Sequence, residues 1–245
     1  MRIKVVLSSK GFTIPISYQS ILQGVIYSLL SKDDLGNFYH DEGYHHDRKI
    51  FKCFNFSQLF GQYTIKNKVL KFDERFYFYI SSQDERFLKS IYKTLLMNET
   101  LLIANKYVKI EDVELINLKP FSGIKTVTIQ TLSPMLIYST SNNYSTYYKP
   151  SDNQSHQFII QNIKDKSKAY HYPLKELVFN IKNVIYEKER MMKYKNCFYK
   201  CYMTKMEVET NFETLLLLYN CGISSKGSCG FGMIDICYEK GHLPL

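Results

Sequence analysis

The stretch that decides the fold reads Gly222-Ile223-Ser224-Ser225-Lys226-Gly227-Ser228-Cys229-Gly230-Phe231-Gly232. It follows an apolar helical run at 215–219 and precedes a β-like run at 233–238. This order, from helix to strand, excludes a P-loop, which runs from a strand into a helix. Glycine permits positive φ and close backbone approach, and successive N–H groups in such a loop form a concave site for anions. With Lys226 at its centre, the loop is expected to lie against a phosphate backbone or, more simply, to close a sheet.

The chain is long enough for a large core and carries an excess of positive charge. Its 245 residues include 32 Lys and Arg against 23 Asp and Glu, which gives a net charge of +9. The segment 164–205 holds eleven basic residues against four acidic ones. Such a segment suits a polyanion, although a solvated basic face is the simpler explanation. The 21 Tyr and 16 Phe can stack on bases or pack in half-buried strands.

The six cysteines are expected to remain reduced thiols in a cytoplasmic protein. No pair of them has the Cys-x2-Cys spacing of a zinc site. The first residues, 1–7, alternate apolar and charged side chains instead of forming the core of a signal peptide. No uninterrupted apolar run approaches membrane-spanning length. The sequence therefore predicts no metal, no other cofactor and no membrane partner.

Apolar periodicity predicts two successive sets of elements in the same order, β-α-β-β-α-β, the first with some elaboration. In the first half, strands are expected at 1–7, 51–56, 69–72, 76–80 and 107–118, helices at 18–29 and 83–97, and a loop at 33–48. In the second half, strands are expected at 124–131, 184–186, 198–208 and 233–238, and helices at 155–169 and 210–219, the latter with Thr210 or Asn211 as its N-cap.

A connection between the halves is expected at Lys119-Pro120-Phe121-Ser122-Gly123, which contains both Pro and Gly. This connection predicts domains at 1–119 and 120–245. The order β-α-β-β-α-β is that of the ferredoxin-like fold. The predicted fold class is therefore α+β, with tandem ferredoxin-like (RRM-like) domains. Fold alone does not indicate an activity.

Five sequence blocks resemble, in the same order, blocks of one protein family. They are Leu22-Gln23-Gly24-Val25-Ile26-Tyr27, His40-Asp41-Glu42-Gly43-Tyr44, the block at 51–59, Thr131-Leu132-Ser133-Pro134-Met135 and the glycine-rich stretch. The last block is similar to the C-terminal signature of the RAMP superfamily of CRISPR-associated proteins. The set as a whole resembles the sixth Cas family, the endoribonucleases that cut CRISPR repeat transcripts. The resemblance implies the same tandem ferredoxin-like architecture.

The resemblance also implies RNA cleavage without a metal ion. A 2′-hydroxyl attacks the adjacent phosphorus and the 5′-oxygen leaves, giving a 2′,3′-cyclic phosphate and a 5′-hydroxyl. The enzyme must remove one proton, deliver another and stabilise charge on the phosphoryl group. The implied partner is CRISPR repeat RNA. The repeats occur in precursor transcripts, and their cleavage releases guide RNAs. Cas subunits of an effector complex and a second copy of the chain, in a homodimer, are further candidate partners.

Three residues match positions with catalytic roles in the family. They are Tyr27, His40 in the His-x-x-Gly block and Lys52 in the Phe-Lys-x-Phe-x-Phe-Ser block. Imidazole exchanges protons near neutral pH, a tyrosine can donate a proton or position the 2′-hydroxyl, and a lysine can hold a phosphate. A short shift of the loop would let His45 or His46 replace His40. Base and acid are not assigned between His40 and Tyr27.

Each of these residues also has a non-catalytic explanation. His40 lies among polar residues, as surface loop histidines do. At about 100° per residue, Tyr27 points away from the apolar stripe of its helix, which suits a surface tyrosine equally well. Lys52 is expected to share a strand face with Phe54 and Phe56, where it needs a phosphate partner or extends to water.

The RNA-binding residues implied by the resemblance lie in the second half. Loop residues expected to contact RNA or to brace the neighbouring domain are Gly222, Lys226, Gly227, Ser228, Gly230 and Gly232, and candidates for phosphate contacts are Lys164, Lys166, Lys168, Lys193 and Lys195. Two alternatives remain. One is a non-catalytic RNA-binding RAMP subunit of a CRISPR effector complex, and the other is a tandem ferredoxin-like protein with no nucleic-acid role.

Overall fold

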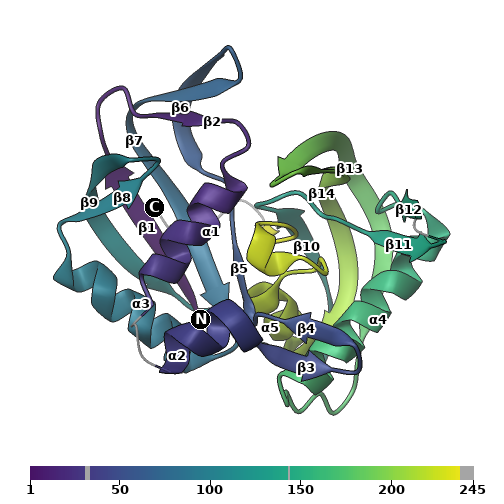
Figure 1. Ribbon diagram of the computed structural model, residues 1–245. Coiled ribbons are helices and arrows are strands. Elements are labelled where there is room, and N and C mark those ends of the chain that lie inside the picture. Colours follow the sequence, from purple (N-terminus) through teal and green to yellow (C-terminus); the bar gives the residue numbers. More distant parts are fainter. Residues whose placement is uncertain (31–33, 143, 238–245) are drawn as a thin grey trace.

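The computed structural model describes residues 1–30, 34–142 and 144–237, which form two main sheets flanked by helices (Figure 1). The N-terminal half consists of β1 (Arg2–Ser8), β2 (Thr13–Pro15), α1 (Gln19–Ser28), α2 (Asp34–Asn37), the π-helix η1 (Phe38–Glu42), β3 (Tyr44–His46), β4 (Lys49–Phe51), β5 (Phe54–Phe56), β6 (Phe60–Lys66), β7 (Val69–Ser82), α3 (Glu85–Met97), β8 (Thr100–Ile103) and β9 (Lys106–Ile116). The C-terminal half consists of β10 (Ile124–Thr131), β11 (Tyr138–Ser141), β12 (Tyr144–Tyr147), α4 (Asn153–Ala169), β13 (Phe179–Tyr194), β14 (Cys197–Asn211), α5 (Phe212–Cys221), the 3-10 helix η2 (Gly227–Cys229) and β15 (Ile234–Cys237). Tyr238, expected at the end of the last strand, lies outside the described residues.

The sheet of the N-terminal half has the strand order of a ferredoxin-like unit. β1 pairs antiparallel with β7 on one side and with β9 on the other. β5 and β6 both pair with β7, so the second, third, first and fourth strands of a β-α-β-β-α-β unit lie side by side. Figure 1 shows α1 and α3 lying across this sheet. Their apolar side chains and those of β1 and β7 belong to one buried cluster.

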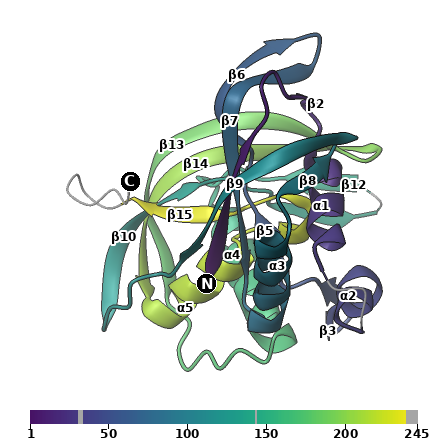
Figure 2. The ribbon, with the colours of Figure 1, turned by 90° about the vertical axis from the view of Figure 1, so that its left-hand side faces the viewer.

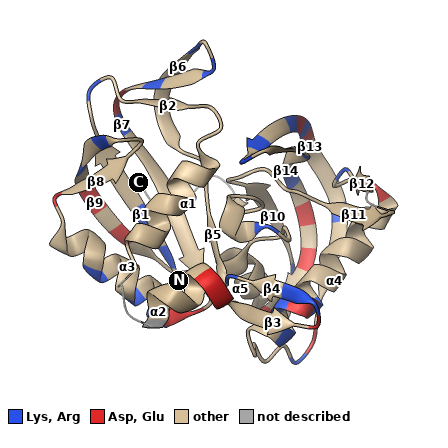
Figure 3. Cartoon of the chain, in the orientation of Figure 1, with Lys and Arg blue, Asp and Glu red and all other residues tan. Residues whose placement is uncertain are grey.

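The sheet of the C-terminal half repeats this order as β13-β14-β10-β15. Figure 2 shows β13 and β14 as long, curved strands, and Figure 3 shows Lys and Arg where the two strands join. The predicted α+β fold with two ferredoxin-like units is therefore confirmed. None of the helices in the described part of the chain is long and apolar enough to cross a membrane.

Two predicted helices begin at caps that the sequence supplies. The side chain of Asp84 accepts a hydrogen bond from the N–H of Arg86 at 2.8 Å and starts α3. The side chain of Asn211 accepts from the N–H of Thr214 at 3.0 Å and starts α5. Of the two predicted caps for α5, Asn211 is therefore confirmed and Thr210 is not. The buried face of α3 repeats at helical spacing and consists of Phe87, Leu88, Ile91 and Leu95.

The stretch 33–48, expected to be a loop, is folded. Asp33 lies outside the described residues, and the rest of the stretch belongs to α2, η1 and the β3–β4 hairpin. The local sequence is polar, but the side chain of Tyr39 is fully buried. Its ring packs on Phe87 of α3, with 4.7 Å between the centroids. A tertiary contact thus determines the structure of a segment whose own sequence favours a loop.

The single strand expected at 51–56 is interrupted. β4 ends at Phe51 and β5 begins at Phe54, and Cys53 between them has a positive φ of 52°. β4 pairs with β3, whereas β5 pairs with β7 in the main sheet. The prediction that Lys52 shares a strand face with Phe54 and Phe56 is therefore wrong, because the chain turns between the two strands.

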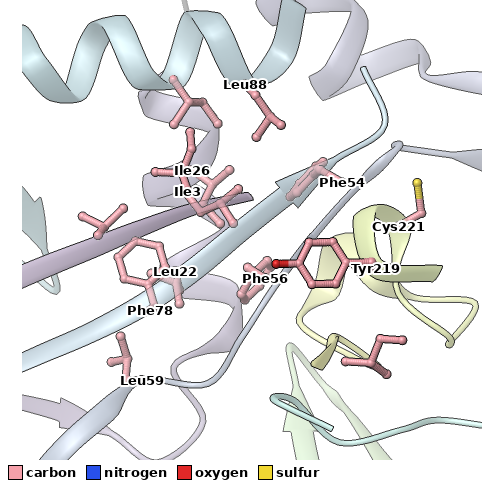
Figure 4. Close-up of a cluster of buried hydrophobic side chains, with 14 of the residues drawn as sticks. Ile3, Leu22, Ile26, Phe54, Phe56, Leu59, Phe78, Leu88, Tyr219 and Cys221 are labelled. Atoms are coloured by element: carbon pink, nitrogen blue, oxygen red, sulfur yellow. The ribbon is translucent and has the colours of Figure 1, made fainter. Parts of the chain in front are cut away.

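The two halves share one hydrophobic core. β5 lies at its centre, and Figure 4 shows Phe54 and Phe56 of this strand close to Tyr219 and Cys221 of α5. A buried Arg2 at the start of β1 links the halves a second time. Its guanidinium donates to the carbonyl oxygen of Ile234 at 2.6 Å and to that of Tyr219 at 3.2 Å. The same group lies 3.7 Å from the ring centroid of Tyr219.

The residue that ends α5 brings the glycine-rich stretch against β5. Gly222 has φ 73° and ψ 164°, a conformation that is essentially confined to glycine. A Cβ atom at this position would overlap the side-chain amide of Asn55 and lie 2.8 Å from the carbonyl oxygen of Gly232. Glycine is therefore required here both for backbone conformation and for close approach.

Replacing Gly222 by alanine should destabilise the fold. We expect Gly222→Ala to lower the free energy of unfolding by about 2–4 kcal/mol, because backbone strain and overpacking act together. Gly24→Ala is the matched control, since nothing lies within 4 Å of a Cβ atom at that position in α1. It should raise the free energy of unfolding by about 0.5–1 kcal/mol. Urea denaturation measures the free energy of unfolding of both variants. An unchanged value for Gly222→Ala would contradict the tight contact with β5.

Candidate active site at the junction of the two halves

His40 contacts both Tyr27 and Lys52. The ring of His40 meets the ring of Tyr27 nearly edge-on, with 5.4 Å between the centroids. Lys52 Nζ donates a hydrogen bond to the backbone carbonyl oxygen of His40 at 3.0 Å. The ring of Tyr27 also packs edge-on against Phe54, at 5.5 Å. Side chains from α1, from η1 and from the β4–β5 connection therefore meet at one place.

The segment that carries His40 is a π-helical turn ended by a glycine. The N–H of Gly43 donates to the carbonyl oxygen of Phe38 at 2.8 Å, and its φ is 79°. A Cβ atom on Gly43 would lie 2.7 Å from the carbonyl oxygen of Phe51 and 3.0 Å from Cδ of Lys52. The glycine of the His-x-x-Gly block thus lets the segments of His40 and Lys52 approach each other closely. π-Helical turns are frequent at functional sites.

The three side chains differ in their electrostatic surroundings. Burial raises the pKa of Tyr27 to about 12, so its hydroxyl is protonated at neutral pH. Burial lowers the pKa of Lys52, while Asp41 and Glu42 oppose this shift. The side chain of His40 is 68% exposed, and its Nδ1 lies 2.6 Å from Oδ1 of Asp41. The cluster therefore combines an exposed imidazole, a phenol that holds its proton and an ammonium group.

The two alternative histidines lie on β3. His45 is exposed and pairs with Ile50 across the β3–β4 hairpin. Nε2 of His46 lies 3.6 Å from the carboxylate of Asp47. Among the described residues, the histidine ring in contact with Tyr27 is that of His40.

The glycine-rich stretch uses its backbone N–H groups inside the protein. The N–H groups of Gly222, Gly230 and Gly232 donate to the carbonyl oxygens of Leu218, Gly227 and Pro134 at 2.7, 2.9 and 2.9 Å. These three groups are not available to a phosphate, so the expected anion site at these glycines is wrong. The other expectation, that the loop braces the neighbouring half, agrees with its contacts on β5.

The stretch also borders the cluster of Tyr27, His40 and Lys52 through α1. Gln23 Nε2 donates to the carbonyl oxygen of Ser228 at 2.6 Å, and Gln23 Oε1 accepts from the hydroxyl of Tyr194. Gln23 lies one turn before Tyr27 on the same helix face. The polar spacing along α1 indicated that this face is not core, but nothing in the sequence indicated that β13 and the loop contact it.

Lys166, expected at a phosphate, is buried beneath the glycine-rich stretch. Its side chain is 2% exposed, and Nζ donates to the carbonyl oxygens of Cys221, Gly222 and Ser224 at 3.2, 2.7 and 2.7 Å. Burial lowers the pKa of Lys166 to about 8. The predicted phosphate contact is therefore wrong, because the ammonium group has no access to solvent. The residue instead fixes the start of the loop.

The other predicted cations remain accessible. The exposed lysines are Lys164 and Lys168 on α4 and Lys193 and Lys195 where β13 and β14 join. Lys226 is half-buried, and its Nζ lies 5.9 Å from the ring centroid of Tyr138 and 5.7 Å from that of Tyr199. Such cation–π contacts hold the ammonium group over a pair of rings. The described residues contain no group of three or more His, Cys, Asp and Glu side chains that could hold a metal ion.

Comparison with known proteins assigns both halves of the chain to one family. Residues 13–114 match CRISPR-associated protein Cas6, N-terminal, and residues 116–236 match CRISPR associated protein Cas6, C-terminal. The chain is 26% identical over 245 residues to a CRISPR-associated endoribonuclease Cas6 of Methanocaldococcus jannaschii, covering 98% of this chain and 94% of the relative. It is 22% identical over 233 residues to a CRISPR-associated endoribonuclease Cas6 of Pyrococcus furiosus, covering 93% and 85%. A solved structure of a CRISPR associated protein Cas6 superposes with a TM-score of 0.79 at 21% identity, over 97% of this chain and 99% of that one.

The fold defines the chain as a tandem ferredoxin-like protein with a Tyr-His-Lys cluster where its halves meet. Together with the matches over both halves, this places it in a family: the chain belongs to the Cas6 family of CRISPR-associated proteins. The resemblance indicated by the five sequence blocks is therefore confirmed.

Replacing Lys166 should cost far more stability than replacing its exposed neighbour Lys164. Lys166→Met leaves three buried carbonyl oxygens without their donor, and we expect the free energy of unfolding to fall by about 3 kcal/mol. Lys164→Met, on the same helix, should change it by less than about 0.5 kcal/mol. Urea denaturation of the two variants makes the comparison. Equal losses would mean that the ammonium group of Lys166 does not hold the loop.

Proposed function

We propose that this chain is a metal-independent endoribonuclease that cleaves CRISPR repeat sequences in precursor transcripts and so releases guide RNAs. The observation that carries the proposal is that His40 contacts both Tyr27 and Lys52. Membership of a family whose relatives are named endoribonucleases supports it. These side chain types suffice for RNA cleavage, because RNA supplies its own nucleophile.

The proposed reaction is an internal transesterification. The 2′-oxygen forms a bond to the adjacent phosphorus, and the bond between phosphorus and the 5′-oxygen breaks. The proton of the 2′-hydroxyl passes to a base on the protein, and the leaving 5′-oxygen takes a proton from an acid. The products are a 2′,3′-cyclic phosphate and a 5′-hydroxyl. Extra negative charge develops on the phosphoryl oxygens and needs a cation nearby.

The surroundings of the three side chains favour one division of roles. A phenol with a pKa of about 12 retains its proton at neutral pH, so Tyr27 acts as a donor toward the leaving 5′-oxygen. The exposed imidazole of His40 accepts the proton of the 2′-hydroxyl, since histidines exchange protons near neutral pH. The ammonium group of Lys52 lies beside His40 and stabilises the charge on the phosphoryl group.

The first experiment incubates the purified chain with CRISPR repeat RNA in EDTA. A parallel substrate carries a 2′-deoxy nucleotide just upstream of the cut. We expect cleavage of the all-RNA substrate alone, with a cyclic phosphate on one product and a 5′-hydroxyl on the other. In the same assay, His40→Ala should lower the single-turnover rate by about 10²–10⁴-fold, and Tyr27→Phe should lower it while retaining the ring contacts.

His45→Ala is the matched control for the histidine, because it removes an exposed imidazole from the neighbouring strand. It should cleave at the rate of the unchanged chain. If His45→Ala abolished cleavage and His40→Ala did not, the proposed site would be wrong. Tight binding without cleavage of either substrate would instead identify a non-catalytic RNA-binding subunit of an effector complex.

RNA binding is proposed to include phosphate contacts at Lys193 and Lys195, both exposed where β13 and β14 join. Each phosphate contact to single-stranded RNA contributes about 0.7 to the slope of log affinity against log salt concentration. The double substitution of both lysines by glutamine should therefore reduce the slope by about 1.4. Lys93→Gln, at an exposed position on α3 of the N-terminal half, is the control. An equal slope for both variants would exclude these phosphate contacts.

A further inference from the structure

A single carboxylate is hydrogen-bonded on both sides of the segment that carries His40. Oδ2 of Asp84 accepts from the hydroxyl of Tyr39 at 2.8 Å and from the hydroxyl of Tyr44 at 2.7 Å. Arg86 Nη2 donates to the same oxygen at 2.8 Å. Tyr39 immediately precedes His40 in η1, and Tyr44 follows Gly43, which ends it. The segment is therefore tied down before and after its histidine.

These hydrogen bonds exceed what the start of α3 requires. Oδ1 of Asp84 accepts from the N–H of Arg86 at 2.8 Å and so caps the helix. Oδ2 accepts the hydrogen bonds from the hydroxyls of Tyr39 and Tyr44. The side chain of Asp84 is 9% exposed. Burial opposes its ionisation, but hydrogen bonds from Arg86, Tyr44 and Tyr39 outweigh burial and hold its pKa at about 2. The acceptor is thus a carboxylate, and bonds to an ionised acceptor are about twice as strong as neutral ones.

His40 needs such support, because its own side chain is poorly anchored. The imidazole is 68% exposed; it touches Tyr27 by one edge contact, and its other partner, Asp41, belongs to the same turn. Its location therefore depends on the backbone of η1. That backbone is fixed by Tyr39, whose ring is fully buried and packs on Phe87 of α3. The carboxylate of Asp84 thus contacts Tyr39 and Tyr44 directly, and the backbone of these two tyrosines lies on either side of His40.

We infer that Asp84 is a positioning residue for His40, acting through Tyr39 and Tyr44. The inference rests on the proposed function, in which His40 exchanges a proton with the RNA. Asp84 does not touch the reacting atoms. It holds the turn in the place where the imidazole reaches the scissile phosphate. Misplacement of a reacting group by about 1 Å costs about 10²-fold in rate.

Asp84→Ser tests this role while keeping the helix cap. Serine caps helices about as well as aspartate, but its single oxygen leaves the hydroxyls of Tyr39 and Tyr44 without their shared acceptor. We expect the single-turnover rate at saturating enzyme to fall by about 10–100-fold. The dissociation constant for the repeat RNA, measured in EDTA, should change by less than about 2-fold, because no phosphate contact is lost.

Glu85→Gln is the matched control, since it removes one carboxylate from the next position. Glu85 is exposed and pairs with Lys89 within α3. The Glu85→Gln variant should therefore cleave at the rate of the unchanged chain. Tyr44→Phe removes one of the two hydroxyl bonds and leaves Asp84 and the cap intact. It provides a second measurement if Asp84→Ser does not fold, with an expected loss of a few-fold in rate.

A double variant separates positioning from a general structural role. In a His40→Ala chain, adding Asp84→Ser should reduce the residual rate by less than about 2-fold, because the side chain to be positioned is already absent. An independent loss of the full 10–100-fold in that chain would overturn the inference, and so would an unchanged rate for both Asp84→Ser and Tyr44→Phe. If His40→Ala alone cleaved normally, the proposed function itself would fail. The two failures are therefore distinguishable.

Discussion

The candidate site depends on one buried charge, the ammonium group of Lys166. Three carbonyl oxygens surround it where α5 ends and the glycine-rich stretch begins. A buried charge without partners costs several kcal/mol, so these carbonyl groups have to point inward at Lys166. This requirement determines which side of the stretch faces the N-terminal half. That side lies on β5 and meets α1 through the carbonyl oxygen of Ser228.

The candidate catalytic side chains belong to the N-terminal half, but they are supported from two directions. From the C-terminal half, Ser228 and Tyr194 hold Gln23 and with it the helix that carries Tyr27. From within the N-terminal half, the start of α3 holds the turn that carries His40. Neither support covers the imidazole itself. The result is a histidine whose backbone is fixed and whose ring remains open to a substrate.

Local features made part of this structure predictable. The caps of α3 and α5 are short-range, and both helices lie within two residues of the predicted bounds. The strand order of the two main sheets follows from the order β-α-β-β-α-β that the sequence predicts for each half. The turn around Tyr39 was not predictable, because its partners belong to a helix more than forty residues further along the chain. The sequence places Lys166 in a basic segment, and its burial is not predictable because the carbonyl oxygens around it lie 55 to 58 residues away in sequence.

The position of β5 has a consequence for synthesis on the ribosome. Phe54 and Phe56 emerge early, whereas α5 and the glycine-rich stretch that cover them are translated more than 150 residues later. Domains form from the N-terminus as the chain grows, but the strand next to the candidate site is not fully covered until residues 212–232 are available. The candidate site is therefore complete only when nearly all of the chain has been made.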